Sequence, residues 1–373
     1  MRFEEKHRYQ VKNHLLSGIT FPKLCKIFKR YYKDIEWIYY LHRILFLVCI
    51  SIFNSSVSLV ESLLFDDKIR RTKIHPEPVF ILGHPRTGTT HIHNLLALDR
   101  NRFAYCSTFQ AGFPNTFLCL ERWKEVLAPI MDKTRPMDAM KLDFDLPQED
   151  EIATNAISGG ISPYLQIVIM KSFNIFKPYF SFEEDCPPSD KEAWEESFMF
   201  FLKKLTFRHG HKPLLIKSPV HTARVKLLLR HFPRAKFIYI HRSPYEVFQS
   251  ACHMADTYYW FCYLNRPSRK DILDFIILQY QLLYHKYVDN RGLIAAGSLE
   301  EVSFADLERD PGSLLRALYH KFGWSGYDSD RVEQYLGSLS DFKKNAHKPL
   351  DEESRKLVQE QWRESFETFG YQL

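Results

Sequence analysis

A loop in the first third of the chain has the residue types that bind a phosphate. The segment GHPRTGTT, residues 83–90, follows the apolar run VFIL and precedes an apolar-periodic run that contains HIHNLL. Its two glycines have the spacing of a P-loop, in which backbone N–H groups and the N-terminus of the next helix surround an anion. We therefore predict a strand, a phosphate-binding loop and a helix in this order.

The loop differs from that of a nucleotide triphosphatase in one position. Thr89 stands where such an enzyme has the lysine that contacts the phosphates. The cation lies inside the loop instead, as Arg86, and a guanidinium together with hydroxyl groups can bind a 5′-phosphate without a metal. A Gly/Thr turn that simply precedes a helix is the alternative. The candidate binding residues are Arg86, Thr87, Gly88, Thr89 and Thr90.

A second candidate phosphate site lies further along the chain. In FIYIHRSPYEVFQS, Arg242 directly follows an apolar strand pattern, and Ser250 comes eight residues later inside the next helix pattern. An arginine at a strand end and a serine two turns into a helix could converge on one phosphate. Taken alone, the same residues describe an ordinary surface arginine and a helix serine.

Together these segments resemble the two nucleotide-binding segments of sulfotransferases that use 3′-phosphoadenosine 5′-phosphosulfate (PAPS). PRTGTTHIHNLL resembles their 5′-phosphosulfate loop and IHRSPYEVFQS their 3′-phosphate segment. EVSFADLERDPGSLLRALYHKFG resembles a third segment that follows in the same family. The variant is closest to the broad RTGTT sulfotransferases, and differs from the K-S-G-T-T loop of the cytosolic phenol and steroid enzymes. The resemblance extends from about Val79 to the end of the chain.

The resemblance implies transfer of a sulfuryl group from PAPS to a hydroxyl of an acceptor, with no metal required. It assigns the loop residues 86–90 to the 5′ end of the donor, and Arg242 and Ser250 to its 3′-phosphate. Lys217, in LLIKSPVH, stands at a strand end where sulfotransferases often have a lysine near the transferring group. A solvated lysine at a strand end is the alternative for Lys217.

The acceptor hydroxyl must also lose a proton to a base. Relatives of this sequence often have a glutamate where Gln110 stands, and an amide cannot be a base. The acidic run in DFDLPQEDEIAT offers Glu149 and Asp150, and His221 lies two residues beyond the position of the histidine in cytosolic sulfotransferases. We favour the Glu149/Asp150 pair and then His221. Carboxylates at a helix start also occur simply because they complement the helix dipole.

Two other functions compete with sulfuryl transfer. One is a P-loop nucleotide kinase or hydrolase, although the loop lacks the lysine and no magnesium-binding aspartate is evident. The other is a non-catalytic, membrane-associated nucleotide-binding protein. Gln110 supports this alternative, because an amide stands where related enzymes have an acidic residue that could act as a base.

The elements that must position these residues alternate between strand and helix patterns. VFIL, PLLIKSP and KFIYI predict strands, while TARVKLLLRHF and SPYEVFQSACHM predict helices. This alternation predicts an α/β fold, a P-loop-like parallel sheet flanked by helices, with a helical N-terminal segment and helical insertions. Ligands of such sheets bind at the carboxyl ends of the strands, where both candidate loops fall.

The N-terminal region has a different composition. We place a basic and apolar helical segment in residues 1–75 and a sulfotransferase domain in residues 76–373. From Ile44 to Val60 there is no formal charge. Three alternatives remain for this segment: a buried helix pair, a helix lying on a membrane surface, and a single membrane span.

The composition limits the partners. The net charge of +6 and the pI near 8.8 fit an anionic ligand or a membrane surface, and exclude the dense basic patch of a nucleic-acid binder. The aromatic share of 15% suits an apolar acceptor pocket, although core packing accounts for most aromatic residues in proteins. We expect a small apolar or lipid-like acceptor, with a carbohydrate as the alternative. Seven cysteines without a CxxC pair argue against a zinc site and favour a reducing compartment. We therefore expect a cytoplasmic protein with membrane association as an option; the sequence indicates no oligomeric state.

Overall fold

The computed structural model of the protein describes residues 3–138, 140–183, 185–339 and 349–373. Two compact units interleave along the chain. The helical unit comprises Met1–Ile74, Cys106–His211 and Met254–Phe275, and the sheet unit comprises His75–Tyr105, Lys212–His253 and Ile276–Leu373. Two helices, α11 (Pro244–Thr257) and α12 (Arg269–Arg291), have residues in both units.

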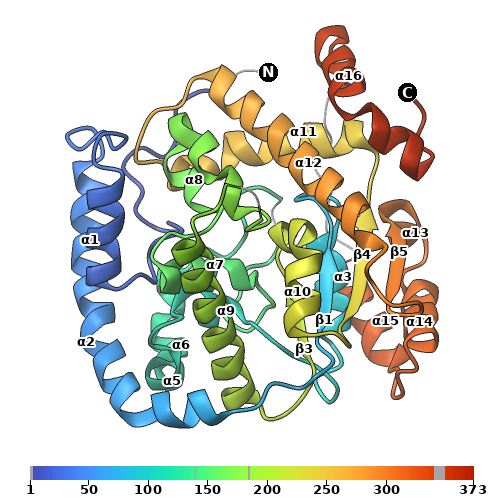
Figure 1. Ribbon diagram of the computed structural model, residues 1–373, viewed down its shortest axis with the longest axis horizontal. Coiled ribbons are helices and arrows are strands. Elements are labelled where there is room, and N and C mark those ends of the chain that lie inside the picture. The colour runs from blue at the N-terminus through green and yellow to red at the C-terminus, as the bar shows by residue number, and fades with distance from the viewer. Residues whose placement is uncertain (1–2, 139, 184, 340–348) are drawn as a thin grey trace. The chain divides into compact units, whose positions relative to one another are not determined.

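The sheet unit contains a five-stranded parallel sheet, seen at its strands β1, β3, β4 and β5 in Figure 1. The strand order is β2-β3-β1-β4-β5. The central strands are continuous apolar runs, because a strand covered on both faces has no polar side to present to water. The predicted α/β fold with a parallel sheet is therefore confirmed. The strands are β1 (Val79–Leu82), β2 (Ala104–Tyr105), β3 (Leu214–Lys217), β4 (Lys236–His241) and β5 (Leu299–Ser303).

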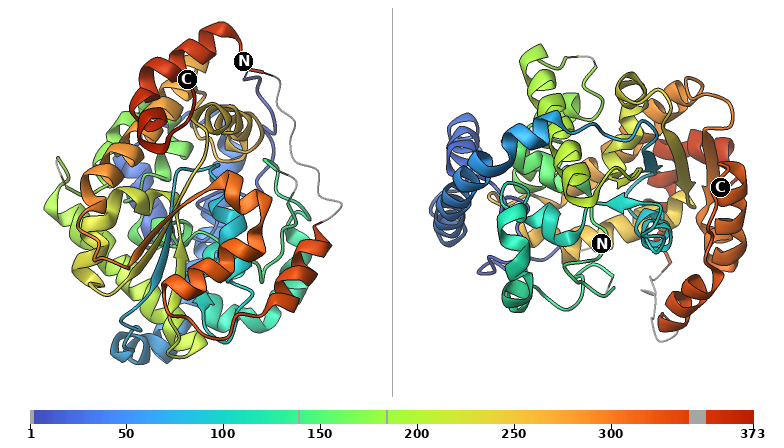
Figure 2. Two further views of the ribbon diagram at one scale, coloured as in Figure 1. Left: turned by 90° about the vertical axis from the view of Figure 1, so that its right-hand side faces the viewer. Right: turned by 90° about the horizontal axis from the view of Figure 1, so that it is seen from below.

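Alternate residues of β1 point to two different packed layers. Val79 and Ile81 join an apolar cluster with α3, α13, α14 and α15, and the left-hand view of Figure 2 shows α3 and α14 on one side of the sheet. On the other face the Phe80 ring stacks on Phe237, with centroids 5.6 Å apart. This period of two is what a parallel strand with both faces buried requires. The helices of this unit are α3 (Thr89–Leu96), η4 (Pro219–Arg224), α10 (Val225–His231), α13 (Phe304–Arg309), α14 (Pro311–Lys321), α15 (Ser329–Ser338) and α16 (Glu352–Phe369).

The helical unit is built from two long helices, α2 and α9, and many short ones. The predicted helical character of the N-terminal segment and of the insertions is confirmed. Its helices are α1 (Phe21–Arg30), α2 (Leu41–Arg71), α4 (Thr108–Gly112), α5 (Phe117–Leu120), η1 (Glu121–Trp123), α6 (Lys124–Leu127), η2 (Ala128–Ile130), α7 (Asp150–Ser158), α8 (Leu165–Val168), η3 (Met170–Tyr179), α9 (Pro188–His209) and η5 (Tyr259–Phe261).

The buried side of α2 is unusually polar. Arg43 donates hydrogen bonds to the carbonyl oxygens of His7, Gln10 and Tyr263, at 2.7–3.0 Å. Asn54 donates to two further carbonyl oxygens near the start of the chain, at 2.8 and 3.0 Å. Such bonds offset the desolvation of buried polar groups, so this side of α2 is held by specific partners.

Further along the same side, Glu61 forms a buried ion pair with Lys204 of α9. The two side chains are 3% and 2% exposed, and Lys204 also donates to the carbonyl oxygen of Pro114 at 2.7 Å. Burial raises the pKa of Glu61 and lowers that of Lys204. The attraction between the two charges therefore offsets the free energy that each loses by leaving water.

We expect Glu61→Gln to lower the free energy of unfolding by about 3–5 kcal/mol, because it leaves the Lys204 charge buried without its counterion. Urea denaturation followed by circular dichroism measures this loss. The matched control is Asp67→Asn, which removes one partner of the exposed Asp67–Arg71 pair and should cost less than about 1 kcal/mol. Equal effects of the two substitutions would contradict the expectation.

Candidate active site

The loop between β1 and α3 has a strained backbone. Gly83 and Gly88 have φ values of +140° and +100°, and Arg86 has a φ of +77°, which is uncommon for a residue with a side chain. Gly88 is the residue before the first turn of α3. Strain of this kind often accompanies a functional site. Here it brings Arg86 and the threonines of the loop to the start of the helix.

Gly88 packs closely against Phe304, which lies in the segment EVSFADL. A Cβ atom at Gly88 would lie 2.3 Å from the ring of Phe304, at the start of α13. The same ring lies under the Arg242 guanidinium, whose carbon is 4.4 Å from the ring centroid. Phe304 thus contacts the phosphate loop and the second arginine at once. A flat apolar ring also restricts the orientation of a guanidinium that stacks on it.

The two candidate phosphate segments contact each other directly. Arg86 Nε donates a hydrogen bond to Ser250 Oγ at 2.9 Å, and Arg242 Nη1 donates to the carbonyl oxygen of Arg86 at 3.2 Å. Arg242 also forms an ion pair with Glu246, one turn into α11, at 3.1 Å. The structure therefore brings Arg86 together with Arg242 and Ser250, which lie 156 and 164 residues further along the chain.

The end of β3 reaches the same loop. Lys217 Nζ lies 3.4 Å from Thr90 Oγ1 at the N-terminus of α3, and the Lys217 side chain is largely buried. Thr222, in η4, accepts a hydrogen bond from the Gly83 N–H at 2.8 Å. His221 is fully buried with its ring edge-on to Phe80, at 5.9 Å between centroids. Lys217 therefore lies at the loop, and His221 is packed beneath it against the central strand.

His84 supplies an uncharged polar group within the loop. Burial lowers the pKa of His84 to about 3, so the imidazole is neutral near pH 7. Nδ1 lies 2.6 Å from the carbonyl oxygen of Pro85, and the ring packs against Tyr280 of α12, at 4.9 Å between centroids. Nε2 is buried and makes no hydrogen bond to any residue that the structure describes.

The substitution Gly88→Ala should destabilise the sheet unit strongly. An alanine Cβ would overlap the Phe304 ring, and the left-handed backbone costs about 1–3 kcal/mol for a residue with a side chain. Thermal unfolding of the full chain measures the effect. Gly337→Ala, in α15, is the matched control, because its Cβ would meet nothing within 4 Å and alanine favours a helix by up to about 1 kcal/mol. A Gly88→Ala protein as stable as the parent would contradict this packing.

The candidate bases Glu149 and Asp150 belong to the helical unit, at the N-terminus of α7. Tyr164 donates a hydrogen bond to Glu149 Oε2, and burial together with the neighbouring Glu149 raises the pKa of Tyr164 well above 10. Asp150 is buried, whereas Glu149 is half-buried. Glu151, also buried, accepts a hydrogen bond from Ser162 Oγ at 2.6 Å. Of these carboxylates, Glu149 is the more accessible to an acceptor.

Gln110 has a structural explanation in the same unit. It forms a capping box with Ser107 at the start of α4, and its Nε2 lies 2.8 Å from His209 Nε2. The amide thus closes a helix N-terminus and contacts α9. No acidic group is needed at this position for either contact.

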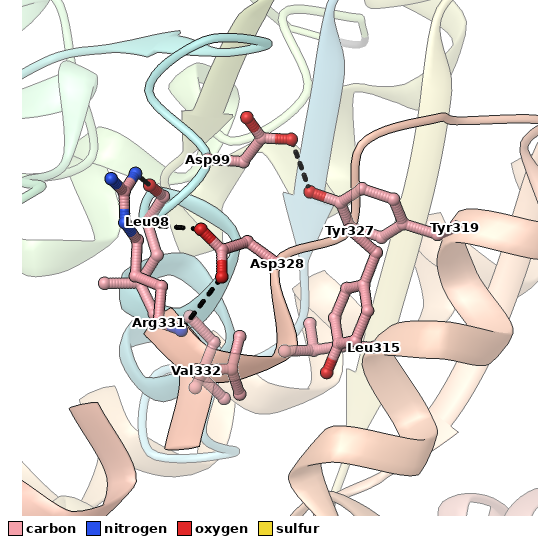
Figure 3. A pocket seen from close by; sticks show the side chains of 9 residues that line it. Leu98, Asp99, Leu315, Tyr319, Tyr327, Asp328, Arg331 and Val332 are labelled. Carbon is pink, nitrogen blue, oxygen red and sulfur yellow. Dashed lines mark hydrogen bonds and ion pairs between the residues drawn. The ribbon is translucent and has the colours of Figure 1, made fainter. Parts of the chain in front are cut away.

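Figure 3 shows a cavity of the sheet unit that is far too small for a substrate. It encloses about 10 Å³, roughly the space of one water molecule. Tyr319 Oη donates to Asp99 Oδ2 at 2.7 Å beside it. A larger cavity, of about 330 Å³, is lined by residues of α12 and α16 that include Tyr280, Tyr284 and Trp362. None of the predicted site residues lines either cavity.

The arrangement around residues 83–90 suits an anion with two charged ends. Two arginines and a lysine, several hydroxyls and a helix N-terminus gather at the carboxyl ends of β1, β3 and β4. Guanidinium groups and backbone N–H groups stabilise negative charge on a phosphate or a leaving group. The sheet unit is therefore a P-loop-like α/β fold with a loop whose residues suit an anionic ligand.

Comparison with known proteins identifies the family. The profile described as "Sulfotransferase family" matches residues 78–329. The chain is 33% identical, over 324 residues, to the omega-hydroxy-beta-dihydromenaquinone-9 sulfotransferase Stf3 of Mycobacterium bovis, and the match covers 86% of this chain and 82% of that protein. The same-named protein of Mycobacterium tuberculosis matches to the same extent. The chain therefore belongs to the sulfotransferase family, whose members are transferases.

Solved structures agree on the fold. The crystal structure of the sulfotransferase STF9 from Mycobacterium avium superposes with a TM-score of 0.66 at 18% identity, covering 88% of this chain and 85% of that one. STF1 from Mycobacterium tuberculosis superposes with a TM-score of 0.66 at 14% identity, covering 92% and 91%. At these identities the likeness concerns the fold alone.

Proposed function

We propose that this sulfotransferase transfers a sulfuryl group from PAPS to a hydroxyl of a small, lipid-like acceptor. The observation that carries the donor assignment is the contact of the two arginine segments, Arg86 with Ser250 and Arg242 with the Arg86 carbonyl. A donor with phosphate groups at both its 5′ and 3′ positions needs two cationic segments, whereas ATP has no 3′-phosphate. We further propose that residues 76–373 form the sulfotransferase domain and residues 1–75 its N-terminal segment.

In this proposal the loop residues Arg86, Thr87, Gly88, Thr89 and Thr90 bind the 5′-phosphosulfate. Arg242 and Ser250 bind the 3′-phosphate. Lys217, close to Thr90, neutralises charge that builds on the bridging oxygen as the sulfur–oxygen bond breaks. The sulfuryl group then passes to the acceptor oxygen while the bisphosphate leaves.

The acceptor proton goes to a carboxylate of the Glu149/Asp150 pair. Glu149 is favoured within the pair because it is less buried and because Tyr164 fixes one of its oxygens. A positioned carboxylate is a sufficient base for a hydroxyl in a transfer reaction. His221 is the alternative, and its full burial against Phe80 counts against it.

The acceptor class is supported by the relative that shares a third of the sequence. Its name gives a hydroxylated menaquinone derivative as its substrate. A hydroxyl at the end of an isoprenoid chain is therefore our first candidate acceptor, and a carbohydrate hydroxyl is the second. The N-terminal helices would bring the enzyme to the membrane in which such a lipid is dissolved.

A thermal-shift series tests the donor. Adenosine 3′,5′-bisphosphate should raise the unfolding temperature of the full chain, whereas Mg-ATP should not, since only the former has a 3′-phosphate. Transfer of labelled sulfate from PAPS should then mark long-chain isoprenoid alcohols in preference to sugars. Stabilisation by Mg-ATP alone would overturn the donor assignment, and labelling of sugars alone would overturn the acceptor class.

A further inference from the structure

One face of α2, opposite the polar buried side, is apolar and open to solvent. At 3.6 residues per turn, the exposed apolar side chains fall within an arc of about 140° around the 31-residue helix, so they form a single face. Each is between 47% and 80% exposed. We define this outer face of α2 by Leu41, Leu45, Ile52, Phe53, Leu59, Val60, Leu63 and Leu64.

The polarity of α2 is therefore unusual for a helix on the surface of a water-soluble domain, because its outer face is apolar while its buried side mixes polar residues with Ile44, Leu47 and Ile69. Its buried residues include Arg43, Asn54 and Glu61, each with defined partners inside the helical unit. Only 28% of its most apolar stretch is buried, although the helix is long and apolar enough to cross a membrane. Crossing would separate Glu61 from Lys204 and Arg43 from its three carbonyl oxygens. The helix is thus fixed along the surface of its unit.

An apolar face of this extent has a binding partner in most proteins. The neighbouring helix indicates which one. α1 lies alongside α2 in Figures 1 and 2, and the Phe21 N–H donates a hydrogen bond to Ser55 Oγ of α2 at 2.8 Å. The sequence of α1, FPKLCKIFKR, has four basic residues and no acidic one. Lys26 and Lys29 of α1 are exposed.

Aromatic and basic residues also follow α1. Tyr32 is exposed, Lys33 is exposed, and Ile38 is 93% exposed just before α2 begins. An apolar helix face next to lysines and an aromatic residue matches the interface of an anionic bilayer, where acyl chains meet negative headgroups. A second copy of the chain fits less well, because two-fold pairing through this face would bring the two lysine-bearing helices together.

We propose that the outer face of α2, flanked by the lysines of α1, docks the protein onto a membrane with anionic headgroups, with α2 lying in the plane of the interface. This docking rests on the proposed function, because an enzyme with a lipid acceptor must reach the membrane that contains the lipid. Its physical basis is independent of the donor site, because every residue named belongs to the helical unit.

Co-sedimentation of the full chain with lipid vesicles tests docking. The protein should bind vesicles of phosphatidylcholine mixed with phosphatidylglycerol, bind pure phosphatidylcholine more weakly, and lose affinity as salt rises. Leu59→Glu combined with Leu63→Glu should weaken binding by roughly 100-fold or more, because two side chains no longer enter the bilayer. Lys26→Glu combined with Lys29→Glu should weaken it about fivefold or more for each lysine, and only on anionic vesicles.

The matched control is Val126→Glu combined with Leu293→Glu. Both residues are exposed and apolar, and neither lies on α2. This control should bind vesicles as the parent does. Vesicle binding that survives Leu59→Glu/Leu63→Glu would overturn the proposal. The proposal would also be overturned if the parent protein did not bind vesicles and instead formed an oligomer that Leu59→Glu/Leu63→Glu dissociates. The outer face of α2 would then be an interface between two copies of the chain.

The same preparations separate this proposal from the proposed function. Stabilisation by adenosine 3′,5′-bisphosphate reports on the sheet unit and needs no membrane. If Leu59→Glu/Leu63→Glu keeps that stabilisation and loses vesicle binding, docking is supported. If the parent shows the stabilisation and no vesicle binding, docking is overturned and the donor assignment stands. If it binds vesicles and adenosine 3′,5′-bisphosphate has no effect, docking stands and the donor assignment fails.

Discussion

Replacing Arg242 with alanine is expected to abolish the thermal stabilisation by adenosine 3′,5′-bisphosphate. In our proposal this guanidinium contacts the 3′-phosphate, and it also donates to the Arg86 carbonyl oxygen. A hydrogen bond to a charged group contributes about 1.5–3 kcal/mol, so each one lost should weaken binding about 10- to 150-fold. Calorimetric titration of the full chain measures the change.

Two further arginine substitutions serve as controls for Arg242→Ala. Arg363→Ala removes an exposed arginine of α16 that forms an ion pair with Glu367, one helix turn further along, at 3.0 Å. This substitution should leave nucleotide affinity unchanged. Arg242→Lys keeps the charge but cannot stack its head group as a plane on Phe304. It should therefore bind with intermediate affinity. Unchanged affinity in Arg242→Ala would remove Arg242 from the donor site.

Glu149→Gln should reduce the rate of sulfuryl transfer by about 10²- to 10⁴-fold, the usual contribution of a general base. The amide has the same shape as the carboxylate and still accepts a hydrogen bond from Tyr164, so the fold should persist. Nucleotide binding should not change, because the bisphosphate does not need the base. Single-turnover transfer from labelled PAPS measures the rate.

Glu353→Gln is the matched control for this second prediction. Glu353 is an exposed acidic residue in the first turn of α16, the position at which a carboxylate complements a helix dipole. It should leave the rate unchanged. If Glu149→Gln and Asp150→Asn both transfer sulfate at the parent rate, the carboxylates serve only their helix, and His221 becomes the next candidate.

The strands and helices that the sequence predicted correctly share a strong local signal. β1, β3 and β4 contain the apolar runs VFIL, LLI and FIYI, which are followed within three residues by Gly83, Pro219 and Arg242, and α11 begins at Pro244. β5 was not predicted, because LEEVS contains two adjacent glutamates and lies at the sheet edge, where only Val302 of the strand is buried. β2 spans only two residues, which is too short for any period to be seen.

The N-terminal helices show what a pattern cannot decide. The charge-free stretch after Ile44 predicts an apolar helix, and α2 is one. The sequence does not reveal that its polar residues face inward, since Arg43 and Asn54 find carbonyl partners in loops distant along the chain. Only tertiary contacts determine which side of such a helix is buried.

Residue types were enough to select most of the segments that the structure brings together around residues 83–90, but not the contacts between them. The sequence assigned Arg86 to the 5′ end and Ser250 to the 3′-phosphate of a donor, but it did not reveal that the two side chains are hydrogen-bonded to each other. Phe304 was missed as a site residue, although its segment EVSFADL carries the family resemblance. Gly88 has no room for a Cβ because the Phe304 ring lies against it. The sequence shows the glycine, but only the fold shows which residue packs there.

In the donor assignment that we propose, the bond between Arg86 and Ser250 adds an energetic penalty to the selectivity of the site. A ligand that engages Arg86 must displace the serine hydroxyl, and Ser250 then needs another partner. A nucleotide with a 3′-phosphate supplies that partner at the moment it is needed, whereas one without it leaves the hydroxyl unsatisfied. Under this assignment, an adenine nucleotide without a 3′-phosphate binds less tightly, because the Ser250 hydroxyl loses the hydrogen bond from Arg86 and gains no phosphate partner.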